Sequence, residues 1–345
     1  MTSPKGKRTW STEVRNGSEP ARFDPPSARP AIRDLAERAS AELDAALDAL
    51  GVVERARLAD LPLTAGIQAL GMWGTDQSYG RVPPAFQSVI DRLRSQGGEA
   101  WERCYLRLLL YAQLARLRQH ILPLRVPESV WQTTETGLVT LLDALPAYTA
   151  GAWIRDDVLK DLAMASSRAV CVGIRLLEPV RLRPWWRAAR SPLRQRLGLV
   201  RYLGVDFLRR GRYTTTHAWR GHREARGTEP WEIWYLRVAD IMEANADLVG
   251  QLGIGWMFDP ALGRLAPHLA ASIEGRRAIG ACEFKIGVNE RATEFALRTS
   301  ETRRRLYAEG QYVPTEWASI TKRPLLVKWA RAYRARSHDQ PGGAP

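Results

Sequence analysis

Two histidines and three arginines lie close together in the stretch THAWRGHREARG, residues 216–227. The β-branched and aromatic segment GRYTTTHAW predicts a strand that ends near His217, and PWEIWYLRVADIMEAN after the stretch predicts a helix. His217 is therefore a candidate general base at a strand end. The free N–H groups of the next helix, with Arg220, Arg223 and Arg226, would favour a phosphate or pyrophosphate group. An ordinary exposed basic turn has the same composition, so both interpretations stay open.

A second candidate element is GIGWMFDP, residues 253–260, which predicts a strand closed by a turn. Its two glycines allow a close approach to the backbone, and Trp256 is a candidate wall of a substrate pocket. Asp259 is either a polar anchor in that pocket or the N-cap of the next helix. Further along, Tyr307 in TSETRRRLY is a candidate proton donor if the pocket extends to it.

Several chemistries lack their signatures in this sequence. The three cysteines are too few and too scattered for a disulfide framework or a four-thiolate zinc site. His217 and His222 are five positions apart, which does not bring them to one helical face, and no HExxH motif occurs. No GxSxG element, reactive-cysteine signature or paired-carboxylate spacing is present. The sequence predicts no metal centre.

The positive charge is concentrated in one segment. The chain has 51 basic and 37 acidic residues, a net charge of +14, and residues 181–226 hold 13 arginines against two acids, a net of +11. Within this segment, LRQRLGLVRYLGVDFLRRG predicts a helix with apolar residues on one side, namely Leu193, Leu197, Val200, Leu203 and Phe207. Such a segment, preceded by Trp185 and Trp186, suits an anionic membrane, a nucleic-acid backbone or a phosphate-bearing ligand. It also suits a solvated face whose leucines pack on the protein.

The remaining patterns predict an α+β fold, in which an all-helical N-terminal region precedes an α/β domain with a small mixed sheet. We expect a flexible leader over residues 1–30, a helical domain over 31–180 and a basic connecting segment over 181–212. The α/β domain would span 213–335, with a disordered tail over 336–345. Helices are expected over 128–145 and 156–177, and a long one from Glu99 to Pro123. No apolar run reaches the roughly 18 residues of a membrane span and the N-terminus has no secretion signal, so we expect a cytoplasmic protein, either free or peripheral to a membrane.

The C-terminal half resembles a group of uncharacterised bacterial proteins. In that group a strand-end histidine precedes a Trp-Tyr-rich helix, a G-x-SW-F/Y-DP element and an RR-x-LY-EG-Y-P element, which correspond here to GIGWMFDP and RRRLYAEGQYVP. The order of strand, basic loop, helix, glycine-rich strand, helix and strand is also similar to the core of the Gcn5-related acetyltransferase superfamily. That resemblance implies an acyl-coenzyme A donor whose pyrophosphate is held by the loop between strand and helix.

Two functions follow from these patterns. The first is a transferase-like enzyme, an acyltransferase with His217 as general base, Arg220, Arg223 and Arg226 at the donor phosphates, and Trp256 in the acceptor pocket. The alternative is a protein without enzymatic activity that binds nucleic acid or an anionic membrane through residues 181–226. Oligomeric state and substrate have no signature in the sequence.

Overall fold

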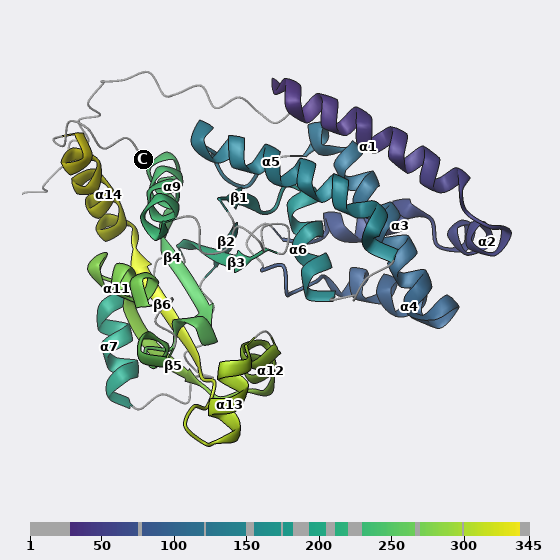
Figure 1. Cartoon of the computed structure of the whole chain (residues 1–345). Helices are drawn as coiled ribbons and strands as arrows, with labels where there is room; N and C mark the ends of the chain where they lie inside the picture. Colours follow the sequence, from purple (N-terminus) through teal and green to yellow (C-terminus); the bar gives the residue numbers. More distant parts are fainter. Residues whose placement is uncertain are drawn as a thin grey trace, which may run out of the picture.

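The computed structural model describes residues 28–74, 78–120, 122–149, 155–173, 175–181, 193–204, 211–219, 230–265, 270–298 and 300–338. It has helices at the N-terminal end and a six-stranded mixed sheet with further helices after them (Figure 1). The expected α+β fold with a helical N-terminal region is confirmed.

The N-terminal part is built around one long helix. The helices here are α1 (Pro30–Asp48), α2 (Val52–Asp60), α3 (Leu63–Gly71), α4 (Pro84–Ala115), α5 (Glu128–Ala144) and α6 (Arg155–Ala165). The C-terminal half of α4 is buried on nearly every side, which agrees with its apolar residues covering more than half of its circumference. The helix begins earlier than expected, at Pro84, because it continues across a kink at Gly97 and Gly98, where Gly98 takes a φ of +65°.

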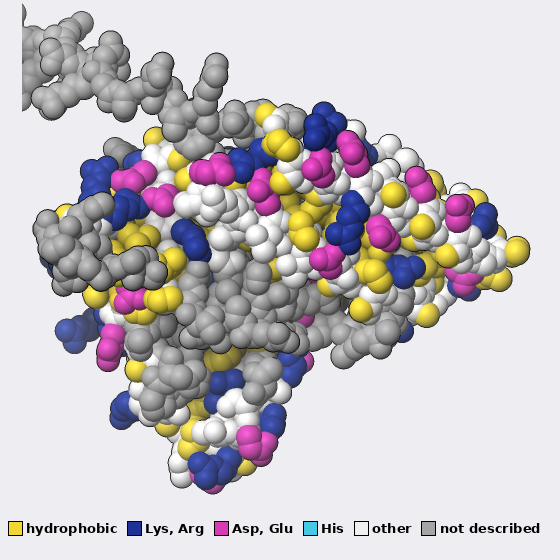
Figure 2. All heavy atoms as spheres, turned by 45° about the horizontal axis from the view of Figure 1, so that its top comes forward, with side chains coloured by type: hydrophobic (Ala, Val, Ile, Leu, Met, Phe, Trp, Pro, Cys, Tyr) yellow, Lys and Arg dark blue, Asp and Glu magenta, His cyan; other side chains and the backbone are white. Residues whose placement is uncertain are grey.

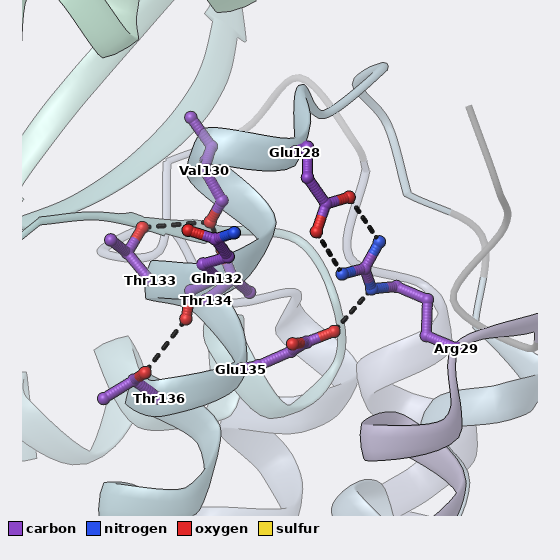
Figure 3. A network of polar contacts seen from close by, with 8 residues as sticks. All are labelled: Arg29, Glu128, Val130, Gln132, Thr133, Thr134, Glu135 and Thr136. Carbon is purple, nitrogen blue, oxygen red and sulfur yellow. Dashed lines mark hydrogen bonds and ion pairs between the residues drawn. The ribbon is translucent and has the colours of Figure 1, made fainter. Parts of the chain in front are cut away.

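Arg29 fastens the start of α1 to α5 (Figure 3). Its guanidinium group donates to both carboxylate oxygens of Glu128 (2.9 and 2.8 Å) and to Glu135. The two glutamates are two turns apart and so lie on one face of α5. The guanidinium carbon also lies 5.0 Å from the centre of the Trp131 ring. This partly buried fork ties together elements about a hundred residues apart.

The helix expected over 156–177 is wrong in its second half. Helix α6 ends at Ala165, and the chain forms a hairpin of β1 (Val170–Val172) and β2 (Arg175–Arg181). Ser167 takes a φ of +57°, and the N–H groups of Arg168 and Ala169 donate back to the carbonyl of Ala163, which closes the helix. Both strands are buried on both faces, so they lack the alternation of apolar and polar residues that identifies a strand. The segment expected to be wholly helical therefore contributes two strands to the sheet.

The strands of the sheet are ordered β1–β2–β3–β4–β6–β5. The later strands are β3 (Arg212–Ala218), β4 (Leu248–Gly255), β5 (Cys282–Gly287) and β6 (Glu316–Lys322). The segments GRYTTTHAW, DLVGQLGIGWMFDP, GACEFKIG and VPTEWASIT predict these four strands from their apolar, β-branched and glycine residues. Only β3 and β4 run parallel among the described pairs, and helix α9 (Trp231–Ala244) lies in the connection between them.

The other helices surround this sheet. They are α7 (Leu193–Leu203), α10 (Leu262–Leu265), α11 (Ala270–Ala278), α12 (Glu290–Arg298), α13 (Glu301–Ala308) and α14 (Arg323–His338). The segment NERATEFALRTSETRRRLYAEG predicts a helix that is broken near Thr299. Helix α12 does end at Arg298, and Ser300 caps α13 by accepting from the N–H of Arg303.

One apolar core joins the N-terminal helices to the sheet and to helices α9 and α14. It runs from Ile32 of α1 and Leu109 of α4 to Val238 of α9 and Leu326 of α14. The hydroxyls of Thr133 and Thr134 on α5 also donate to the carbonyl of Cys171 in β1 (2.7 and 3.2 Å). A smaller core lies beneath α7, where Leu199 contacts the side of the sheet that includes Tyr213, Leu252 and Ile320.

Basic and acidic side chains are interspersed over the N-terminal helices, on the face that Figure 2 shows. Pairs such as Arg33–Asp34 and Arg38–Asp143 account for this mixture. Within the described residues, no helix is both long and apolar enough to cross a bilayer.

Candidate functional site

The two parallel strands of the sheet separate before they end. The register of β3 with β4 runs from Arg212–Leu248 to Thr215–Leu252 and stops there. Beyond that point β3 continues to Ala218, paired only with β2, and β4 continues to Gly255, paired with β6. The gap therefore opens at the carboxyl ends of two parallel strands, where open α/β sheets bind ligands.

A cavity of about 460 Å³ lies at this gap. The ends of β3 and β4, the turn Trp256–Phe258, helix α12 and the start of β6 line it from the sheet. The first two turns of α6, through Asp156, Asp157 and Lys160, and the loop residue Tyr79 line it from the N-terminal helical part. The cavity is thus formed jointly by the two halves of the chain.

His217, which is partly buried, and Glu178, which is buried, form a pair at the edge of this cavity. The Nε2 atom of His217 lies 2.9 Å from Oε1 of Glu178, whose side chain is 1% exposed. Both carboxylate oxygens of Glu178 also accept the main-chain N–H of Tyr79 (3.1 and 3.0 Å). The Tyr79 ring stands edge-on against the imidazole, with the ring centres 4.4 Å apart. Because a carboxylate only accepts, it selects the tautomer with the proton on Nε2 and leaves the Nδ1 lone pair free.

A second charged group faces the same cavity from α6. Lys160 pairs with Asp156 (2.8 Å) and with Asp157 (3.5 Å), one turn away on the same helix. The hydroxyl of Tyr79 donates to the Asp156 carboxylate (3.1 and 3.2 Å). Tyr79 therefore links the Lys160–Asp156 pair to the His217–Glu178 pair. Asp156 and Asp157 lie in the first turn of α6, where the helix dipole stabilises negative charge.

The apolar wall of the cavity consists of three aromatic rings, and an arginine side chain lies over one face of each ring. The guanidinium carbon of Arg303 lies 4.3 Å from the centre of the Trp256 ring, and that of Arg276 lies 4.7 Å from Phe258. On α12, Arg298 lies 4.6 Å from Phe295. These contacts hold the rings in place and leave a surface that is both apolar and polarisable.

The end of β3 is held by a third polar contact. The indole N–H of Trp219, which is 1% exposed, donates to Oδ1 of Asp161 on α6 (2.6 Å), and the hydroxyl of Tyr148 donates to Oδ2 of the same carboxylate. Asp161 is fully buried. This contact fixes the strand end that carries His217 against the helical part.

The structure brings together two of the residues singled out from the sequence, since His217 and Trp256 line the same cavity. Asp259 is buried and accepts the N–H of Ala261 (3.0 Å), as a helix cap does, and burial raises the pKa of its carboxyl. Tyr307 is 43% exposed on α13 and does not line the cavity.

The arginines of the predicted phosphate loop, Arg220, Arg223 and Arg226, lie outside the described residues. The same holds for most of the arginines between 181 and 226. Of the described ones, Arg212 pairs with Asp247 and donates to the carbonyl of Pro123 (3.1 Å).

The sequence interpretation missed Tyr79, Lys160 and Glu178. One signal was present for Glu178, which is the lone acid in the apolar run LLEPV. A buried carboxylate in such a run needs a partner, and His217 is that partner. Nothing local marks Tyr79 or Lys160, whose roles depend on contacts with distant elements. The described residues include no cluster of three or more His, Cys, Asp or Glu side chains able to hold a metal ion.

Comparisons of this chain with models of protein families, with curated proteins and with solved structures gave no match.

Proposed function

We propose that this protein is an acyltransferase that takes an acyl group from a phosphate-bearing donor, such as acyl-coenzyme A, and transfers it to an acceptor held in the cavity. The observation that carries the proposal is the separation of β3 from β4 beyond Thr215 and Leu252, with the His217–Glu178 pair at its edge. Separated strands offer main-chain N–H and C=O groups to an extended ligand, much as a sheet edge does to an added strand.

The order of the elements supports the same proposal. The parallel pair β3–β4 is joined through a basic loop and α9, and β6 lies between β4 and β5. This order resembles the acetyltransferase superfamily named above, in which the corresponding loop holds the pyrophosphate of the donor. In this chain that loop carries Arg220, Arg223 and Arg226, which remain the proposed phosphate ligands.

His217 is the proposed general base, and Glu178 and Tyr79 are positioning residues. The acyl donor supplies a carbonyl group activated by its thioester. His217 would accept the proton of the attacking nitrogen or oxygen as that atom bonds to the acyl carbon and the carbon–sulfur bond breaks. The proton then passes to the leaving thiolate, so the step is balanced. Glu178 would keep the imidazole in the required tautomer and stabilise its protonated form.

Trp256 is proposed to line the acceptor pocket together with Phe258 and Phe295. The Asp156–Lys160 pair lines the same cavity as these rings. An acceptor with an apolar body and one polar reacting end fits such a lining, because the body contacts rings and the reacting end stays near His217.

Release of free thiol from acetyl-coenzyme A, measured with a panel of amines and alcohols, tests this function. We expect His217→Ala to lower kcat/KM by about 10²–10⁴-fold while acetyl-coenzyme A still raises the melting temperature. Glu178→Gln should lower kcat by a similar factor with little change in KM for the donor, because an amide has no charge to stabilise the protonated imidazole and can also donate to Nε2, which favours the other tautomer.

Tyr307→Phe is the matched control, since Tyr307 is exposed on α13 and away from the cavity lining. This variant should keep the activity and the donor affinity of the unaltered protein. The proposal fails if neither acetyl-coenzyme A nor longer acyl-coenzyme A species stabilise the unaltered protein. It also fails if His217→Ala leaves thiol release unchanged.

A further inference from the structure

Helix α7 presents a stripe of apolar side chains to solvent. Leu193, Leu197 and Val200 are 70%, 61% and 46% exposed. Their spacing of four and three residues puts them on one face of the helix. Of the interpretations left open by the sequence, the one in which these side chains pack on the protein does not fit the exposure of these three residues. Large apolar side chains gathered on one exposed face indicate an interaction surface.

Arginines border this stripe on both sides. At about 100° per residue, Arg194 and Arg201 fall on one flank of the Leu193–Leu197–Val200 face, and Arg196 falls on the other. Arg194, Arg196 and Arg201 are all exposed, and α7 has no acidic residue. An apolar stripe with arginines on both flanks is the pattern of a helix that lies in the interface of an anionic membrane.

The opposite face of α7 fixes the helix in this orientation. Leu199 is 3% exposed and packs in the core beneath the helix. The hydroxyl of Tyr202 donates to the carbonyls of Gly280 (3.0 Å) and Ile320 (3.2 Å) and accepts the N–H of Lys322 (3.3 Å). The apolar stripe is therefore held outward by contacts on the other side of the helix.

Helix α7 lies at one edge of the sheet. It packs against the edge strand β5, on the side of the molecule away from the N-terminal helices (Figure 1). Its neighbours in sequence have the same chemistry. Residues 181–192 hold four arginines, two tryptophans and no acid. Tryptophan prefers the headgroup level of a bilayer, and each arginine near an anionic surface adds to the attraction.

We infer that α7 docks the protein on an anionic lipid bilayer, with Leu193, Leu197 and Val200 inserted at the headgroup level and the flanking arginines on lipid phosphates. A nucleic acid fits this face less well. Its phosphates would lie against the leucines that separate the arginines on the two flanks of the helix. The aromatic residue of α7, Tyr202, is also bonded to the sheet and is not offered to bases. This inference does not depend on the proposed acyltransferase activity.

Flotation of the full chain with lipid vesicles tests the inference. We expect binding to vesicles that contain phosphatidylglycerol and phosphatidylcholine, and weak binding to vesicles of phosphatidylcholine alone. The double variant Leu193→Asp, Leu197→Asp should lower the partition coefficient on anionic vesicles at least tenfold, because it puts two carboxylates into the inserting face. Its melting temperature should stay close to that of the unaltered protein, since both side chains are exposed.

The matched control is Val52→Asp, Val53→Asp on α2. These valines are also exposed, at 86% and 57%, but α2 has two basic and two acidic residues. This variant should bind vesicles like the unaltered protein. The inference is overturned if the α7 variant binds anionic vesicles as well as the α2 variant does. It is equally overturned if the unaltered protein does not bind the anionic vesicles but does bind an RNA or DNA oligonucleotide.

Discussion

Gly253 in β4 has no room for a side chain, and adding one methyl group there tests the geometry of the candidate site. A β-carbon at Gly253 would lie 2.2 Å from Cζ of the Phe258 ring and 2.7 and 2.8 Å from its two Cε atoms. Carbon atoms pack at about 3.5–4.0 Å, so the ring would have to move by roughly 1 Å. Phe258 is 5% exposed and has Arg276 over its face, so this movement meets packed neighbours.

Gly253→Ala should therefore destabilise the protein by about 1–3 kcal/mol, the usual cost of overpacking. Urea unfolding at constant pH measures this difference. Because Phe258 also lines the cavity, the variant should bind acetyl-coenzyme A or its acceptor more weakly even where it remains folded. The glycines of GIGWMFDP were expected to allow a close approach to the backbone, and at Gly253 the group that approaches is the Phe258 ring.

A double-mutant cycle separates the contact from a general effect of alanine. Phe258→Leu makes space, so the cost of Gly253→Ala should be smaller in that background, with a coupling of about 0.5–3 kcal/mol. Gly71→Ala is the control, because nothing lies within 4 Å of a β-carbon there. It should be neutral or slightly stabilising. If Gly253→Ala and Gly71→Ala have equal unfolding free energies, the packing of the turn on β4 is not as described.

The remaining predictions concern stability. Burial lowers the pKa of His120 from 6.5 to about 4. As the pH falls, this imidazole is therefore protonated in the unfolded chain before it is protonated in the folded protein. The free energy of unfolding should fall by about 3 kcal/mol between pH 7 and pH 4. His120→Gln should remove this part of the dependence in urea titrations at each pH, and an unchanged slope would contradict the pKa shift. Arg29→Met should cost about 1–3 kcal/mol, because it leaves Glu128 and the partly buried Glu135 without their cation, whereas Arg33→Met at an exposed pair should cost less than about 0.5 kcal/mol. Equal melting temperatures for the two arginine variants would show that the bonds of Arg29 to Glu128 and Glu135 stabilise the protein no more than the exposed Arg33–Asp34 pair does.

Local patterns were sufficient for much of the C-terminal half. Strands β3 to β6 combine β-branched or aromatic residues with turn residues at their ends, and helix α9 is preceded by Pro230. The break near Thr299 and the turn at Gly310, which has a φ of +69°, follow from capping residues within a few positions. These features depend on interactions between near neighbours, so a single sequence contains them.

The hairpin β1–β2 could not be predicted in the same way. A strand that is covered on both faces has a continuous apolar run, and such a run has the same composition as a buried helix. Strands β1 (Val170–Val172) and β2 (Arg175–Arg181) form because α5 contacts β1 and β3 pairs with β2. Those partners belong to other parts of the chain.

The candidate site also contains residues that the local sequence identifies and residues that only distant contacts bring in. His217 and Trp256 could be selected from the sequence because each stands at the end of a recognisable strand. Glu178 lies 39 positions from His217, and Tyr79 lies 99 positions from Glu178, so no local pattern pairs them. Only the packing of the helical half against the sheet brings them to one cavity.

The orientation of α7 was likewise decided by tertiary structure. The sequence establishes an amphipathic helix with arginines beside leucines, and this pattern is compatible with the leucines facing inward or outward. The hydrogen bonds of Tyr202 and the burial of Leu199 against the sheet select the outward direction for Leu193 and Leu197. Residue types thus establish which groups are present, and which of them meet depends on contacts between elements that are distant in the chain.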